Sequence, residues 1–427
     1  MSSRADEAPP KAAAAETIPD SHIQASKRVA LLVLGGCLLI WFGRRPEQLF
    51  HPYLWDEESN VLRRFLDDGW LGALRPDEGY LILPATLLLP LAAIISFTHL
   101  TVVAFWMATT VFALTVWMMV VPDSRWGNRG TRVFMAFAMA LCPANPETFG
   151  VLLYSFWWAT LWPVIVLGWK RDLWWARAPL LIIAGLSSPA GAVMAIPFAV
   201  SWWFTRRRAD AVAAGILAAA LAVQITVVMT GHRGAAVSTD LRLLLAQSLR
   251  TVGLFVIWWT TPDHAHWRFN MLVGLVLFGM LAAAAGCALR RRHRIEPLLL
   301  LVAVALFTGL SAAPTPLTSN PQDGAPRYYF LPFILLSWLL VFLWRESLLP
   351  SPIPVVAGVL VVTSMLGIVT TFSRSQASTT GRLDWQQEIF DCATSNAGTV
   401  KIPVYYDGSA GSLWSMNMTP TECRARL

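Results

Sequence analysis

The sequence is poor in charged residues for its length. Asp, Glu, Lys and Arg make up 14% of the 427 residues, against about 25% in ordinary soluble domains, whereas 56% of the residues are hydrophobic. An aqueous environment does not account for so much apolar surface. The apolar runs recur along the whole chain, and several approach the roughly 20 residues that a helix needs to cross a bilayer. We therefore predict membrane-spanning helices, because lipid offers backbone groups no other partner.

Cysteine and the short motifs of common cofactor sites are also scarce. None of the five cysteines has the CxxC spacing of a metal site, and no Walker loop, Rossmann fingerprint or Ser-His-Asp order occurs. The pair His264 and His266 lacks a third ligand nearby, so we interpret it as a solvated loop. We therefore expect no metal and no cofactor. Cys392 and Cys423 lie in the polar tail, where a disulfide is expected if that tail is outside the cytoplasm.

The net charge of +7 comes from short basic clusters between apolar runs, not from one basic stripe. We therefore expect no nucleic-acid partner. Clusters of Lys and Arg in short loops mark the cytoplasmic side of a membrane protein. The clusters are Lys27 and Arg28; Arg125, Arg129 and Arg132; Lys170, Arg171 and Arg177; Arg206 to Arg208; Arg290 to Arg294; and Arg345.

Placing all these clusters inside predicts an all-α polytopic protein of the inner (plasma) membrane with about eleven transmembrane helices. Residues 1–28 form a disordered cytoplasmic tail in this prediction, residues 29–372 form the transmembrane domain, and residues 373–427 form a small extracytoplasmic tail. The first external loop, residues 43–100, carries interfacial helices. The run Leu81–Phe97 is one of them, interfacial or re-entrant, because a full crossing there would move the next basic cluster outside.

A second long external segment is predicted between the spans Ala211–Thr230 and Met271–Leu289, and it contains Arg250. The spans themselves are almost free of charge. Charged residues that do face the outside are therefore candidates for the site.

The first external loop contains the acidic run Asp56, Glu57 and Glu58. None of these three has a basic residue three or four positions later, whereas a helix from Asp56 to Asp68 would pair later residues at i, i+4 spacing. Those pairs are Arg63 with Asp67 and Arg64 with Asp68. One interpretation makes Asp56, together with Glu57, a general base for an attacking hydroxyl or amine. The other makes the run an acidic helix start, with Asp56 as the cap; the two are compatible.

This order of features resembles the C-type integral-membrane glycosyltransferases. They too have a first span, an external loop opening with acidic residues, two interfacial helices and a series of short-looped spans. The superfamily includes aminoarabinose transferases, protein O-mannosyltransferases and bacterial glucosyltransferases that decorate surface polysaccharides. An Asp or Glu of the first external loop is its catalytic base, and the donor is a sugar on a polyprenyl phosphate. The resemblance implies that Asp56 is the base and that Glu57 or Glu58 is its partner.

Looser matches extend the resemblance over Val29 to Phe372. The matching segments are Gly79 to Leu81, Pro143 to Glu147, Leu186 to Pro189, and Arg327 to Phe330. They suggest Glu58, Tyr80, Glu147, Arg327 and Tyr328 as substrate-binding residues. Arg327 would hold the lipid phosphate through charge-assisted hydrogen bonds, or would serve as an interfacial anchor beside its tyrosines. Glu147 would contact sugar hydroxyls or remain solvated.

The sequence thus predicts a hexosyl or pentosyl transferase whose active site faces the extracytoplasmic side. Its partners would be the lipid bilayer, a polyprenyl-phosphate-linked sugar donor and a glycan, lipid or protein acceptor, with inversion and retention both open. Two alternatives remain. A polysaccharide polymerase or ligase would use large Arg-rich external loops, and a multi-pass transporter or flippase would show an internal repeat and charges within its spans.

Overall fold

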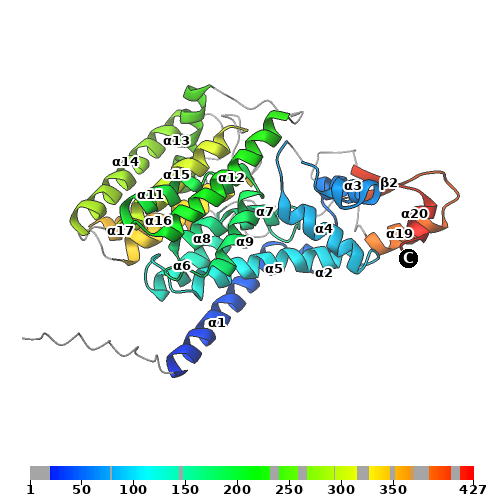
Figure 1. The fold of residues 1–427 in the computed structure, drawn as a ribbon, viewed down its shortest axis with the longest axis horizontal. Helices are drawn as coiled ribbons and strands as arrows, with labels where there is room; N and C mark the ends of the chain where they lie inside the picture. Colours follow the sequence, from blue (N-terminus) through cyan, green and yellow to red (C-terminus); the bar gives the residue numbers. More distant parts are fainter. Residues whose placement is uncertain are drawn as a thin grey trace, which may run out of the picture.

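Most of the described chain is helical (Figure 1). The computed structural model describes residues 20–76, 79–143, 148–230, 240–257, 267–292, 294–314, 327–346, 352–366, 368, 384–404 and 414–427. The helices are α1 (Asp20–Arg44), α2 (Pro46–Phe50), α3 (Asp56–Ala73), α4 (Leu83–Ile95), α5 (Leu100–Val120), α6 (Arg129–Ala140), α7 (Ser155–Thr160), α8 (Trp162–Gly168), α9 (Trp174–Gly185), α10 (Pro189–Ala192), α11 (Ala195–Thr205), α12 (Arg208–Thr230), α13 (Leu241–Ile257), α14 (Trp267–Arg292), α15 (Glu296–Ala312), α16 (Arg327–Arg345), α17 (Pro352–Leu366), α19 (Trp385–Thr394) and α20 (Pro420–Arg424).

Four of the described helices, α5, α12, α14 and α16, are long and apolar enough to cross a membrane. The most buried of them is α16, with 83% of its apolar window inside the protein. Its 19 residues rise about 28 Å at about 1.5 Å each, close to the roughly 30 Å of a bilayer's hydrocarbon core. Several shorter apolar helices accompany these four. The fold is therefore consistent with a helical membrane protein.

The segment predicted to be the first external loop, residues 43–100, is largely helical where it is described. The run predicted as interfacial contains α4, which has 13 residues and is too short to span unaided. Helix α3 continues past the predicted end at Asp68 through a kink at Gly69, whose φ of 63° suits glycine. Arg63 forms the predicted ion pair with Asp67. The other predicted pair is wrong, because the chain after the kink brings the Pro76 carbonyl to Arg64 and the Arg75 side chain to Asp68.

Two other segments differ from the sequence prediction. Helix α1 begins at Asp20, so residues 20–28 are helical and not part of a disordered tail. Residues 241–257, expected in an external segment, form α13, which packs closely on α14. An added Cβ at Gly253 would lie 1.9 Å from the Asn270 carbonyl oxygen, so only glycine permits this approach. Arg250 is 2% exposed, and its Nη1 lies 3.3 Å from the Tyr329 hydroxyl.

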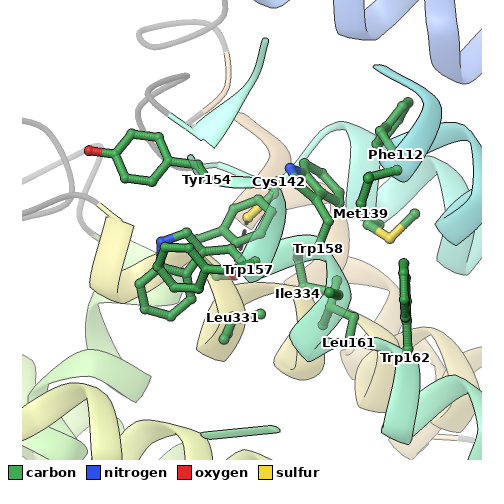
Figure 2. Packing of buried hydrophobic residues seen from close by; sticks show 14 of the residues in the cluster. Phe112, Met139, Cys142, Tyr154, Trp157, Trp158, Leu161, Trp162, Leu331 and Ile334 are labelled. Atoms are coloured by element: carbon green, nitrogen blue, oxygen red, sulfur yellow. Dashed lines mark hydrogen bonds between the residues drawn. The ribbon is translucent and has the colours of Figure 1, made fainter. Parts of the chain in front are cut away.

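A core of aromatic side chains surrounds α7 (Figure 2). Trp158 is fully buried, and its ring lies 4.8 Å from the rings of both Phe112 and Phe330, centroid to centroid. Its indole N–H donates to the Thr148 carbonyl at 3.0 Å, so the one polar group of this buried side chain keeps a hydrogen bond. This packing fixes the start of α7, and with it the side chains of Tyr154 and Trp157 at the edge of the cluster.

The C-terminal residues 384–427 form a small cap that is not purely α-helical. Strands β1 (Val400–Val404) and β2 (Trp414–Met418) pair antiparallel, with Val400 opposite Met418. Apart from this two-stranded sheet the described elements are helices, which is consistent with the expected all-α class. Five-residue strands next to a short polar segment give too weak an alternation to be recognised in the sequence.

The cap is held together by a disulfide and docked at two places. Cys392 of α19 and Cys423 of α20 form the disulfide. The Trp385 indole N–H donates to the Phe97 carbonyl, at the turn between α4 and α5, over 2.7 Å. Arg63 of α3 pairs with Glu422 of the cap at 3.1 Å. The cap therefore lies against the same loop that carries the acidic run (Figure 1).

Candidate active site

A cavity of about 350 Å³ lies where α3, α7, α10, α12, α15 and α16 meet. It collects residues from segments far apart in the sequence. Its polar lining residues are Glu57, Tyr80, Tyr154, Ser188, Ser311, Arg327 and Tyr328. Most of the remaining wall is apolar, with side chains such as Ile82, Leu153, Phe156 and Leu310. Such a cavity suits a ligand that is polar at one end and apolar at the other.

Four of the predicted site residues, Glu57, Tyr80, Arg327 and Tyr328, meet in this cavity. Asp56 is the first residue of α3, next to Glu57, but its side chain lies outside the described part of the structure. Glu147 also lies outside the described residues. The position of these two carboxylates relative to the cavity stays a prediction.

Glu58 is buried beside the cavity and is absent from its lining. Its side chain is 2% exposed. One carboxylate oxygen accepts the Trp55 N–H at 2.7 Å and the other accepts the Leu153 N–H at 2.8 Å. The Glu58 side chain folds back over the helix start, so a role for it in substrate binding stays a prediction. The side chain ties α3 to the segment before α7, and so holds Glu57 opposite Tyr154.

The environment of Glu58 favours its protonated form. Burial raises the pKa of this carboxyl from 4.5 to about 7, because the charged form loses its hydration. The backbone N–H donors of Trp55 and Leu153 work in the opposite direction, since they stabilise the anion. The neighbouring charge of Glu57 adds to the rise. Near neutral pH, Glu58 is therefore close to half protonated.

Glu57 faces Arg327 across the polar end of the cavity. The carboxylate Oε1 lies 3.5 Å from Nη1 of Arg327, and the two side chains are 20% and 31% exposed. The same Nη1 donates to the Tyr154 hydroxyl at 2.8 Å. The guanidinium also lies 5.6 Å from the centre of the Tyr328 ring, within cation–π range. These contacts orient a cation at the cavity wall.

Aromatic rings form one wall of the cavity. Phe156 and Trp157 lie 4.7 Å apart, and Trp157 meets Tyr328 edge to face at 6.1 Å, centroid to centroid. Trp157 is 6% exposed, and its indole N–H has no hydrogen-bond partner within the described chain. A buried donor without a partner costs stability. Because this nitrogen is itself buried, a ligand hydroxyl or phosphate oxygen can accept from it only after the indole turns toward the cavity.

Two buried polar side chains position the remaining lining residues. Gln224 of α12 accepts the Leu81 N–H at 3.0 Å and donates to the Leu81 carbonyl at 3.3 Å, which fixes the backbone beside Tyr80. Ser188 caps α10 by accepting the Gly191 N–H, and its hydroxyl lies 2.9 Å from that of Thr160 on α7. The Leu186–Pro189 segment therefore contributes a fixed edge to the cavity.

The described residues contain no group of three or more His, Cys, Asp or Glu side chains that could hold a metal ion. His264 and His266 lie outside the described residues. Among the described residues, one carboxylate, one guanidinium and several hydroxyl and indole groups line the cavity beside its apolar wall.

Sequence reasoning missed Tyr154, Trp157, Ser188 and Ser311 as individual lining residues. Tyr154 and Trp157 are three residues apart, which places them on one face of a helical turn. That spacing was the available signal, but both residues lie in the apolar run Leu152 to Trp169, whose composition favours a membrane span. Comparison of the chain with protein-family models, curated proteins and solved structures gives no match.

Proposed function

We propose that the chain is a membrane glycosyltransferase that moves a sugar from a polyprenyl-phosphate donor to an acceptor on the extracytoplasmic side of the inner membrane. About eleven spans would carry it. The observation that supports this function best is the pairing of Glu57 with Arg327 in a cavity whose wall is mostly apolar. A lipid-linked sugar has the same division, with an apolar chain, an anionic phosphate and a polar sugar.

The cavity suggests a role for each group. Arg327 donates to the phosphate oxygens and stabilises the charge that they gain as the bond from the anomeric carbon to the phosphate oxygen breaks. The acceptor oxygen forms the new bond to the anomeric carbon, and its proton passes to a carboxylate of the acidic run. Glu57 is the described carboxylate in the cavity, and Asp56 beside it is the base that the family resemblance implies. The lipid phosphate leaves as an anion, so no nucleotide or redox partner is needed.

The Glu57 and Arg327 contact suggests how substrate binding prepares the base. In this structure the carboxylate and the guanidinium are 3.5 Å apart. A donor phosphate competes for the same guanidinium, and charge-assisted bonds to phosphate are strong and often bidentate. When Arg327 turns to the phosphate, the Glu57 carboxylate loses that contact and is ready to accept a proton. The aromatic wall of Trp157 and Tyr328 would meet the sugar ring.

A transfer assay in proteoliposomes tests this function. The donor is the polyprenyl-lipid fraction of cells fed ¹⁴C-labelled glucose, and the acceptor is the envelope fraction of cells that lack the gene. We expect the wild type to move label from lipid to acceptor, and Glu57→Gln or Asp56→Asn to lower the rate at least 100-fold, as loss of a general base does. Asp68→Asn is the matched control, because Asp68 is an exposed carboxylate on the same helix that pairs with Arg75. No label transfer by the wild type, or full activity in both Glu57→Gln and Asp56→Asn, contradicts the proposal.

One observation favours the transporter or flippase alternative. Arg250 lies buried among α13 and α16, with Nη1 3.3 Å from the Tyr329 hydroxyl and 3.5 Å from Oε1 of Gln247. Buried charges within a helical bundle often mark the path of an ion or anionic substrate. Movement of a fluorescent polyprenyl phosphate between leaflets, reduced by Arg250→Gln and unchanged by Glu57→Gln, would support transport over transfer.

A further inference from the structure

A second cavity lies at the other end of α16. Arg327, the first residue of α16, lines the first cavity, whereas Glu346, just after its last residue, lines the second. The helix between them rises about 28 Å, so the two cavities are about one hydrocarbon core apart. If α16 spans the bilayer, the second cavity lies at the opposite membrane surface.

The second cavity has a volume of about 320 Å³ and a basic lining. At about 30 Å³ for each molecule, it has room for about ten waters. Five of its lining residues are cationic and three are anionic, so the lining carries a net charge of 5 − 3 = +2. The cations are Arg125, Arg129, Arg132, Lys170 and Arg294.

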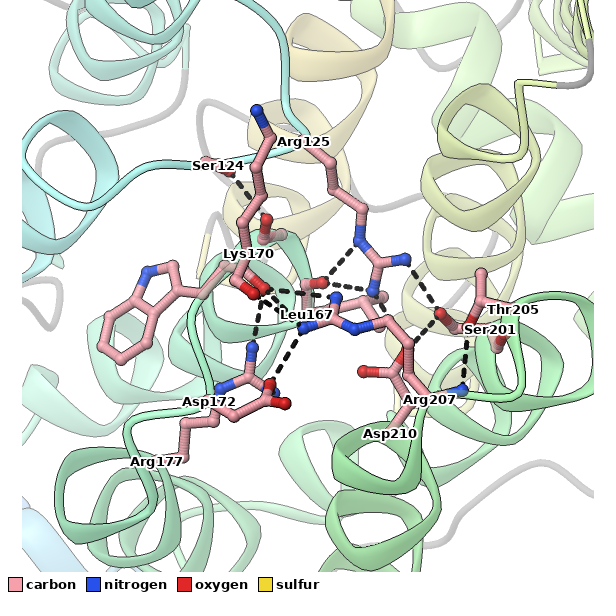
Figure 3. A network of polar contacts seen from close by, with 12 residues as sticks. Ser124, Arg125, Leu167, Lys170, Asp172, Arg177, Ser201, Thr205, Arg207 and Asp210 are labelled. Carbon is pink, nitrogen blue, oxygen red and sulfur yellow. Dashed lines mark hydrogen bonds and ion pairs between the residues drawn. The ribbon is translucent and has the colours of Figure 1, made fainter. Parts of the chain in front are cut away.

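One of these cations is used to build the fold (Figure 3). Arg125 donates to the Leu167 carbonyl and the Ser201 hydroxyl and lies 3.3 Å from Oδ2 of the fully buried Asp210. These contacts fix the loop between α5 and α6 against the end of α8. The ammonium group of Lys170 extends away from this network in Figure 3.

The three carboxylates of the cavity compensate part of its positive charge, and one of them, Glu296, pairs with Arg294 at 3.0 Å. Asp123 and Lys170 are 3.4 Å apart, but their side chains are 60% and 56% exposed, so water screens this pair. Glu346 accepts the Asn128 N–H at 3.0 Å and the Thr131 hydroxyl, at the start of α6.

Arg132 supplies the second observation. It is 6% exposed and donates from Nη1 to the Val120 carbonyl at 3.0 Å. Its Nε has no hydrogen-bond partner within the described chain. Arg132 also donates to the Pro122 carbonyl, so its guanidinium is fixed in the cavity wall and adds positive charge beside Lys170 and Arg129.

Aromatic side chains near the second cavity indicate which kind of anion surrounds it. The guanidinium of Arg345 lies 4.9 Å from the centre of the Phe134 ring, and that ring is 41% exposed. Exposed aromatic residues with neighbouring Arg are typical of the interface between bilayer and water. Phospholipid headgroups are concentrated there, and basic pockets between spans bind them.

We propose that the second cavity binds the phosphate group of an anionic phospholipid in the leaflet opposite the first cavity. Lys170 and Arg129 contact the phosphate oxygens, and Arg132 adds its positive charge from the cavity wall. The site does not depend on the transferase function, since it uses none of the residues assigned to sugar transfer. Its effect is to stabilise the protein in membranes rich in anionic lipid, because a ligand that binds only the folded state stabilises it.

A lipid titration tests the proposal. Purified protein in a neutral detergent receives dioleoylphosphatidylglycerol, dioleoylphosphatidylcholine or inorganic phosphate, and the melting temperature is measured at each concentration. The variant combines Arg129→Gln with Lys170→Gln. The matched control combines Arg171→Gln with Arg208→Gln, which removes two exposed cations that do not line the cavity. Both variants replace exposed side chains, and their melting temperatures without lipid verify folding.

We expect a saturable rise in melting temperature with phosphatidylglycerol and none with phosphatidylcholine. The cavity variant should bind phosphatidylglycerol about 30-fold more weakly, about fivefold for each cation removed, and the control should bind it like the wild type. Equal binding by the cavity variant and the wild type overturns the site, as does an equal loss in the control. A rise with inorganic phosphate but not with phosphatidylglycerol overturns the assignment to lipid.

Discussion

The stability of the protein should depend on pH through Glu58. Burial holds the pKa of its carboxyl at about 7 in the folded protein, against 4.5 for an unburied glutamic acid. Between these values the folded state keeps a proton that the unfolded state has lost. The free energy of unfolding therefore falls as pH rises through this window. The stabilising effect of the neutral carboxyl is complete below about pH 4.5 and is lost above about pH 7.

The expected loss of stability follows from the difference between the folded and unfolded pKa values of Glu58. This difference is about 2.5 pH units, and at 1.36 kcal/mol for each unit the loss is about 3 kcal/mol between pH 4.5 and pH 7. Replacing Glu58 by Gln removes the titrating group while keeping the shape and one acceptor oxygen. In this variant, residue 58 should no longer make the stability fall as pH rises. The variant should be less stable than the wild type at low pH, because its amide N–H₂ faces a backbone N–H.

Unfolding by SDS in detergent micelles, followed by tryptophan fluorescence from pH 4.5 to 8, measures this effect. Asp68→Asn is the control, since it removes an exposed carboxylate of the same helix and should keep the wild-type pH dependence. If the unfolding free energies of the wild type and of Glu58→Gln change in parallel with pH, Glu58 is ionised throughout this pH range. The N–H donors would then outweigh burial, and the reasoning would be refuted.

Three further perturbations test packing and the cavity. Trp157→Phe keeps a ring but removes the indole donor, so donor lipid should bind about fivefold more weakly, the value of one hydrogen bond; unchanged affinity would show that the donor is unused. Gly253→Ala places a methyl group 1.9 Å from a backbone oxygen of α14 and should lower the SDS unfolding free energy by about 1–3 kcal/mol. Gly279→Ala, where the added methyl meets open space, should be near neutral, and equal losses in both would contradict the close approach. Replacing Cys392 and Cys423 by Ser should make the cap protease-sensitive, since disulfides contribute about 2–4 kcal/mol; an equally resistant cap would contradict this.

The long apolar helices could be predicted because composition alone encodes them. Helix α13 could not, because three of its buried residues are polar. Gln247, Arg250, Thr251 and Leu254 follow at i, i+3, i+4 and i+7, and each is 2% exposed. A hydrophobicity pattern assigns such residues to water, whereas the packing of α13 on α14 through Gly253 encloses them. The polar partners that make this possible, such as the Tyr329 hydroxyl, come from a distant part of the sequence.

The site was predictable in its residue types but not in its geometry. Glu57 and Glu58 are neighbours in the sequence, but successive residues on a helix point about 100° apart. One carboxylate therefore faces Arg327 in the cavity, and the other turns back to the Leu153 backbone. Which of the two faces the cavity depends on how α3 docks on the segment before α7. That docking is a tertiary contact, and no local sequence pattern predicts it.

The central claim is that the first cavity holds a lipid phosphate against Arg327. Photolabelling with a polyprenyl phosphate that carries a photoreactive group beside its phosphate tests it most directly, with mass spectrometry to locate the label. We predict labelled peptides containing Tyr80, Tyr154 or Trp157, competition by unlabelled polyprenyl phosphate, and loss of label in Arg327→Ala but not in Arg75→Ala. Label found only outside this cavity, or undiminished in Arg327→Ala, would contradict the claim.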